Sequence, residues 1–168
     1  DPQDQYRVFL PQVPEALYAR QIGEEGSNVI AYLKDDNNNG FTLVLTANGG
    51  IDAPSESNLL FGAKDTDNAW NANVKSDDLT NFRTDNATTL AFLFNGSKSL
   101  ETITGIEHLN TTQVQDLTAA FQYCAALTNL DLSSWKTDNV TSVSNMFFQT
   151  TQLQTVTGID TWNMPKLT

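Results

Sequence analysis

The feature that most constrains the fold is an internal repeat of 26 or 27 residues in the second half of the chain. A repeat of this length indicates units that stack on one another, and overlooking it would misassign the whole fold. Four residues, which we call anchors, mark the repeat at intervals of 27, 26 and 27. Apolar side chains recur five, eight, twelve and eighteen residues after the first three anchors, and we number the positions of a repeat from its anchor, position 0. The anchors are Phe82, Leu109, Trp135 and Trp162.

Each repeat combines a strand pattern with a helical spacing. Apolar residues at 140, 143, 146 and 147 recur every three or four residues, which predicts a helix of one or two turns. The L-x-x-L-x-L stretch at 127–132 predicts a short strand that pairs in parallel with its equivalents. Two repeats carry one extra residue inside this strand pattern, in the sequence TGI, which predicts a β-bulge at Gly105 and at Gly158.

These patterns predict an α/β solenoid, a leucine-rich-repeat-like right-handed coil stack with a short parallel strand and a short helix in each coil. It occupies residues 79–168 as three coils and a truncated fourth. The end coil of such a stack needs a cover, so we expect residues 1–78 to form a β-rich N-terminal cap with a hairpin near 28–46. The chain starts with Asp1 and stops within a coil, so we expect it to be a segment of a longer protein.

The turn of this hairpin contains a weak candidate for a metal site. Asp35, Asn37 and Asn39 match the first half of the EF-hand calcium loop. The position of the bidentate glutamate is occupied by Thr46, and the flanking segments are predicted strands, not helices. A hairpin turn explains all of these residues, so we predict no metal and no cofactor.

The charge of the chain excludes several classes of partner. Nine Lys and Arg residues against twenty Asp and Glu give a formal net charge of −11. A nucleic-acid-binding protein needs a basic surface, and an anionic membrane would repel this one. No apolar run approaches the roughly 20 residues of a membrane span. Strong negative charge also opposes self-association, so we expect a monomer that does not insert into a membrane.

Residues that could carry catalysis have simpler structural explanations. His108 lies one residue before an anchor, where the other repeats carry polar residues of a turn. Cys124 lies at position 15, where the other repeats carry Ser97 and Thr150, so a small side chain suffices there. No pair of carboxylates stands out by its spacing. We therefore predict that the chain is not an enzyme.

The predicted strands offer a candidate binding surface. Outward side chains of stacked parallel strands form columns, and here the columns are acidic and rich in hydroxyl groups. Such a surface suits a basic protein patch or hydrogen bonding to glycans. The column consists of Thr104, Glu107, Asp131, Ser133, Thr157 and Asp160.

The pattern W-x-T-x-x-V-T-x-V-x-x-M-F at 135–147, preceded by L-x-x-L-D-L-S-x-W at 127–135, resembles the BspA-like leucine-rich repeats. These repeats occur in cell-surface proteins of lactobacilli, other Firmicutes, oral anaerobes and mycoplasmas. The resemblance covers about residues 79–168; the earlier repeats depart from it at Phe82, Leu109 and Ala87. It implies an extracellular, wall-anchored, non-catalytic bacterial protein that binds host or neighbouring-cell surfaces, and it names no ligand. We expect the partner to be a host matrix protein, mucin or a glycan. The alternative is an architectural stalk or cap that displays another binding domain.

Overall fold

The computed structural model describes residues 16–22, 29–35, 41–46, 51–63 and 71–168, and the chain separates into two compact units, Asp1–Ile51 and Asp52–Thr168. The sequence places the boundary after residue 78, whereas residues 52–63 belong to the second unit. These residues pair with the repeat anchored at Phe82: Leu59 N donates to Ala91 O (3.0 Å), and Glu56 forms a parallel bridge with Thr89. Phe61 and its equivalent Phe94 are 33 residues apart, whereas the other repeats are spaced by 26 or 27 residues. The repeat pattern in the sequence therefore does not reveal this relationship.

The first unit contains a three-stranded antiparallel sheet in the order β1-β2-β3. β1 spans Ala16–Ile22, β2 spans Val29–Asp35 and β3 spans Phe41–Thr46. β2 and β3 pair from Ile30↔Thr46 to Asp35↔Phe41, where the sequence predicts the hairpin. β1 lies along the other side of β2, with an irregularity between Ala16 and Tyr18.

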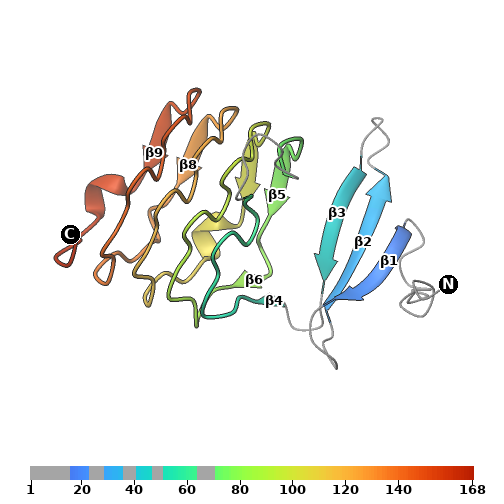
Figure 1. Ribbon diagram of the computed structural model, residues 1–168, viewed down its shortest axis with the longest axis horizontal. Helices are drawn as coiled ribbons and strands as arrows, with labels where there is room; N and C mark the ends of the chain where they lie inside the picture. The colour runs from blue at the N-terminus through green and yellow to red at the C-terminus, as the bar shows by residue number, and fades with distance from the viewer. Residues whose placement is uncertain (1–15, 23–28, 36–40, 47–50, 64–70) are drawn as a thin grey trace. The chain divides into compact units, whose positions relative to one another are not determined.

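The second unit consists of short strands connected by turns (Figure 1). β4 (Ile51–Asp52) pairs with β6 (Phe82–Arg83), β5 (Ser76–Asp78) with β7 (Thr102–Thr104), and β8 (Asn129–Asp131) with β9 (Thr155–Thr157). The β5–β7 and β8–β9 pairs are parallel. Two 3-10 helices of three residues each, η2 (Ile106–His108) and η3 (Ile159–Thr161), follow β7 and β9.

The predicted α/β solenoid is therefore wrong. The described residues contain no α-helix, and the parallel strands form separate two-stranded sheets instead of one continuous ladder. In the segment predicted to be helical, Asn145 has a φ of 57°, and the equivalent Ala119 and Phe92 have φ values of 55° and 60°. A left-handed residue interrupts a right-handed helix. The segment forms successive turns instead, such as the bond from Met146 N to Val143 O (3.1 Å).

These turns leave every second amide free to bond to the neighbouring repeat. The N–H groups at positions 8, 10, 12 and 14 of one repeat donate to the carbonyl groups at positions 7, 9, 11 and 13 of the next. The intervening amides at positions 11 and 13 donate within their own repeat. The bonds between the repeats anchored at Leu109 and Trp135 run from Leu117 to Ser142, from Ala119 to Ser144, from Phe121 to Met146 and from Tyr123 to Phe148, at 2.8–2.9 Å.

Gly105 and Gly158, where the sequence predicts β-bulges, instead precede short 3-10 helices. Gly105 and Gly158 have φ values of 79° and 88° and immediately precede η2 and η3. A Cβ atom at Gly158 would lie 2.2 Å from Ser133 Cα, so the backbone of one repeat approaches that of another too closely for a side chain. The extra residue is thus absorbed after the strand by a left-handed glycine and a 3-10 turn.

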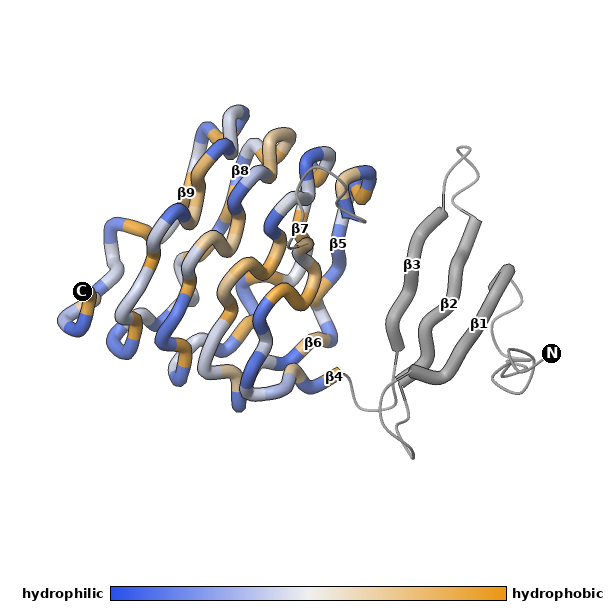
Figure 2. The backbone as a smooth tube through the Cα atoms, in the orientation of Figure 1, coloured by the Kyte–Doolittle hydropathy of each residue, from blue (hydrophilic) through white to orange (hydrophobic). Residues whose placement is uncertain are grey.

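The core lies between the turns and the strands of each repeat. Phe61, Phe94, Phe121 and Phe147 form a column of stacked rings whose centroids are 5.5–5.8 Å apart. Hydrophobic residues recur along each repeat of the trace, separated by hydrophilic ones (Figure 2). Stacking of equivalent side chains from neighbouring repeats explains why the apolar positions recur.

Candidate binding surface on the parallel strands

The parallel strands present polar side chains outward because side chains alternate between the two faces of a strand. The middle residue of β5, β7, β8 and β9 is buried or half-buried, and the first and third residues are exposed. The exposed set carries hydroxyl, amide and carboxyl groups. It consists of Ser76, Asp78, Thr102, Thr104, Asn129, Asp131, Thr155 and Thr157.

All six residues of the predicted column are exposed. Thr104, Asp131 and Thr157 end β7, β8 and β9, and Glu107 and Asp160 lie in η2 and η3. The remaining residue, Ser133, follows β8.

The structure brings some of these residues together and separates others. Asp131 is the direct parallel partner of Thr157 in the β8–β9 pair. Thr104 pairs instead with Asp78 in the β5–β7 pair. The column is therefore divided into two strand pairs. Asp78 could not be predicted from the repeat, because it lies before the first anchor, where the repeat pattern is weakest.

The carboxylates at the ends of β5 and β8 also stabilise the turns that follow. Hydrogen bonds from the Ser133 side chain and backbone lower the pKa of Asp131, and Ser133 N lies 3.0 Å from Asp131 Oδ1. Asp78 Oδ1 accepts from Thr80 Oγ1 (2.6 Å) and Thr80 N (2.9 Å), which lowers the pKa of Asp78. Both carboxylates are charged at neutral pH.

The residues considered for catalysis or metal binding have other surroundings. His108 is exposed, with Nε2 3.5 Å from Glu107 Oε1. Cys124 is fully buried and donates to Phe94 O (3.3 Å); burial, followed by the charge of Asp77, raises its pKa to about 12. No group of three or more potential metal ligands occurs in the part of the chain that the structure describes. Of the calcium-loop candidates, Asp35 ends β2, and Asn37 and Asn39 lie outside the described residues.

The first three anchors pack between repeats and not on the surface. Phe82, Leu109 and Trp135 are buried, and Trp162 is half-buried. Trp135 Nε1 donates to Ile106 O (3.1 Å), and the rings of Trp135 and Trp162 stack with an interplanar angle of 2°. Stacking across the repeats explains why large apolar side chains recur at position 0.

A second recurring side chain, threonine at position 2, joins the repeats through its hydroxyl. Thr84, Thr111 and Thr137 are each at most 3 % exposed. Their Oγ1 atoms donate to the carbonyl one residue after the next anchor, at 2.8–3.1 Å. These threonines are thus structural and do not belong to the candidate binding surface.

The geometry defines a protein of repeated turn-and-strand units with a polar outer face. The chain belongs to the family described as Mycoplasma protein of unknown function, DUF285, whose model matches residues 64–168. Neither a curated protein nor a solved structure matches the chain. None of the helices in the described residues is long and apolar enough to cross a membrane.

Proposed function

We propose that this chain is a non-catalytic adhesion and interaction module at the bacterial cell surface, anchored to the wall through other parts of a longer protein. Its partner is a host matrix protein, mucin or a glycan, bound along the outer face of the parallel strands. The observation that supports this proposal is the exposed array of hydroxyl, amide and carboxyl groups on β5, β7, β8 and β9.

The array suits a broad ligand better than a small molecule. Equivalent side chains on paired strands are spaced by about 4.8 Å, so several groups can bind one extended partner at once. The net charge of the whole chain, −11, favours binding to basic patches on a protein partner. Added salt screens this attraction and should weaken the binding. Uncharged hydroxyl groups at Thr104 and Thr157 supply hydrogen bonds that a glycan can accept or donate.

The experiment is a binding assay of the chain against immobilised matrix proteins, mucin and a glycan panel. The test variant combines Glu107→Gln, Asp131→Asn and Asp160→Asn, which removes three negative charges from the strand face. The control combines Glu56→Gln, Asp85→Asn and Asp138→Asn, three exposed carboxylates that lie outside β7, β8, β9, η2 and η3. We expect the test variant to bind at least about tenfold more weakly and the control to bind normally.

The alternative function is an architectural stalk or cap that displays a different binding domain. Stacked repeats joined by backbone hydrogen bonds suit this role equally well. If the chain is a stalk, it should bind no member of the panel. The strand-face variant and the unmodified chain should then give the same absence of binding. That outcome would remove the support for adhesion through this surface.

A further inference from the structure

In the repeat anchored at Trp135, the segment at positions 8–14 has no neighbouring repeat on one side among the described residues. Between earlier repeats, four N–H groups at positions 8, 10, 12 and 14 donate to carbonyls of the next repeat. In the repeat anchored at Trp135, the equivalent donors have no hydrogen-bond partner among the described residues. These donors are the N–H groups of Val143, Asn145, Phe147 and Gln149.

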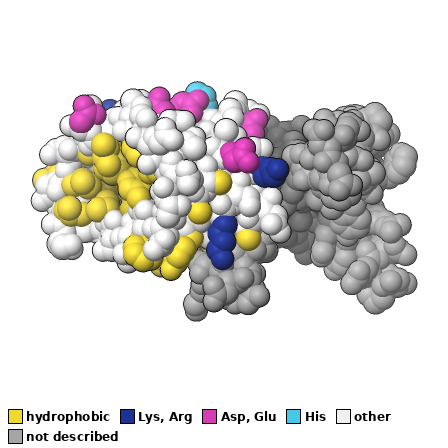
Figure 3. All heavy atoms as spheres, turned by 90° about the horizontal axis from the view of Figure 1, so that it is seen from above, with side chains coloured by type: hydrophobic (Ala, Val, Ile, Leu, Met, Phe, Trp, Pro, Cys, Tyr) yellow, Lys and Arg dark blue, Asp and Glu magenta, His cyan; other side chains and the backbone are white. Residues whose placement is uncertain are grey.

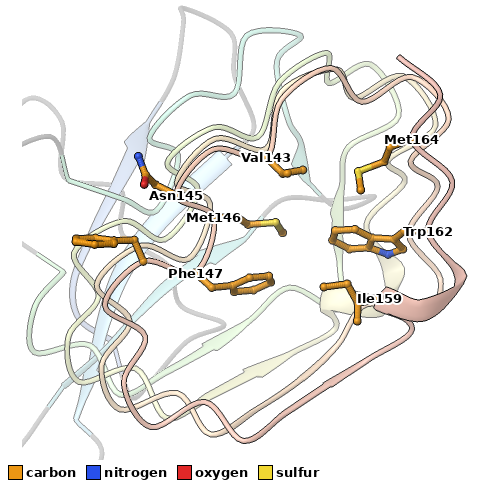
Figure 4. Close-up of a pocket in the computed structure, with 8 residues that line it drawn as sticks. Val143, Asn145, Met146, Phe147, Ile159, Trp162 and Met164 are labelled. Carbon is orange, nitrogen blue, oxygen red and sulfur yellow. The ribbon is translucent and has the colours of Figure 1, made fainter. Parts of the chain in front are cut away.

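Apolar side chains surround these unpaired donors. They line an open hollow of about 430 Å³, across which Met146 and Phe147 point toward Ile159 and Trp162, whereas Asn145 points away (Figure 4). Phe148 and Ile159 are 47 % and 45 % exposed, unusually high for large apolar side chains. Hydrophobic side chains gather toward the C-terminal end of the repeats (Figure 3).

One polar atom of a side chain that lines the hollow is unpaired among the described residues. Trp162 Nε1 is buried and has no hydrogen-bond partner in the part of the chain that the structure describes, whereas Trp135 Nε1 donates to Ile106 O. A row of unpaired N–H groups beside an apolar surface is a template for pairing with another chain segment. We propose that this face binds one further segment with the repeat's own pattern, in parallel and in register.

The existing interfaces specify the chemistry of this segment. It presents carbonyl groups at alternate residues to the four donors and an aromatic side chain to the half-buried ring of Phe147, as Phe147 does to Phe121 (5.7 Å, 8°). The residue at position 6 already sets the alignment of this segment with the Trp135 repeat. Thr168 N donates to Thr141 O (3.1 Å), as Thr141 N donates to Gln115 O (2.7 Å) one repeat earlier. A second copy of this same face does not fit, since both faces would present donors and no acceptors.

The test extends the full chain after Thr168 with SVSNMFFQTTQL, a copy of residues 142–153. This segment supplies carbonyls at positions 7, 9, 11 and 13 and an aromatic residue at position 12. We expect hydrogen exchange at the four donor amides to slow by about tenfold or more. We also expect the tryptophan fluorescence of the chain to shift to shorter wavelength, because Trp162 lines the hollow. The matched control carries the same twelve residues in scrambled order and leaves both signals unchanged.

Two results would overturn the proposal. The first is exchange at the four amides that is unaffected by the extension, or slowed equally by the scrambled control. The second is exchange in the unextended chain that slows with rising protein concentration, which would identify a second copy as the occupant. Because neither readout involves an adhesion ligand, the proposal stands or falls independently of the proposed function.

Discussion

Thr111 and Lys136 exchange two hydrogen bonds across the boundary between neighbouring repeats. Thr111 Oγ1 donates to Lys136 O (3.0 Å) and accepts from Lys136 N (2.7 Å), so one hydroxyl satisfies both backbone groups of Lys136. Thr137 and Asn163 repeat the arrangement one unit later, at 3.1 Å for both bonds. A buried hydroxyl that pairs with both backbone groups of a neighbouring residue explains why position 2 is threonine in these repeats.

Thr111→Val should destabilise the chain by about 1–3 kcal/mol, because valine keeps the volume and leaves both backbone groups of Lys136 without this partner. The measurement is the free energy of unfolding from a denaturant titration. The control is Thr112→Val, the same substitution at the adjacent exposed residue, which should change stability by less than about 0.5 kcal/mol. Equal effects of the two variants would contradict the proposed role of the hydroxyl.

Asp77 should make the chain less stable at neutral pH than at pH 4. It is the middle residue of β5, opposite Ile103, and burial raises its pKa from 3.8 to about 6. The folded state therefore holds this proton more tightly than the unfolded state does, and stability falls as the pH rises from about 4 to about 6. We expect Asp77→Asn to remove this fall and to stabilise the chain at pH 7.5 by up to about 3 kcal/mol.

Asp78→Asn is the matched control for Asp77→Asn. The pKa of Asp78 is lowered by the hydrogen bonds from Thr80, so its carboxylate stabilises the folded state above its ordinary pKa and loses that effect as the pH falls. The two substitutions should therefore change the pH dependence of unfolding in opposite directions. Similar pH profiles for both variants would show that Asp77 is not the buried acid.

Gly158→Ala should cost about 2 kcal/mol or more, because the added Cβ would lie 2.2 Å from Ser133 Cα in a backbone with φ 88°. Thermal unfolding followed by circular dichroism measures the effect. Gly96→Gln is the control: Gly96 also has a positive φ, 83°, but the equivalent residue in the last repeat is Gln149 with φ 61°. The prediction fails if both glycines tolerate substitution equally.

Cys124 should not react with a thiol reagent at pH 8 while the chain is folded, because it is 0 % exposed and its pKa is raised to about 12. Stopped-flow labelling with a chromogenic disulfide reagent should give one thiol per chain only after denaturant is added. Cys124→Ser should fold, since Ser97 occupies the equivalent position, and should abolish all labelling. Rapid labelling of the folded chain would contradict the buried environment.

The repeat and the positions of its apolar residues could be read from the amino-acid sequence, because equivalent side chains stack on one another and must match in character. Phe94, Phe121 and Phe147 recur at position 12 and form the ring column. The alternation of exposed and inward residues could likewise be inferred at Asp131 and Thr157, which end their strands as paired partners.

The backbone between the strands was decided only by the tertiary structure. Apolar residues every three or four positions fit either a helix or successive turns, and the sequence does not distinguish them. Turns with left-handed residues such as Asn145 release every second amide for the neighbouring repeat, whereas a helix would use its amides internally. Those bonds join residues about 26 positions apart, so they stabilise the chain only once the repeats lie side by side.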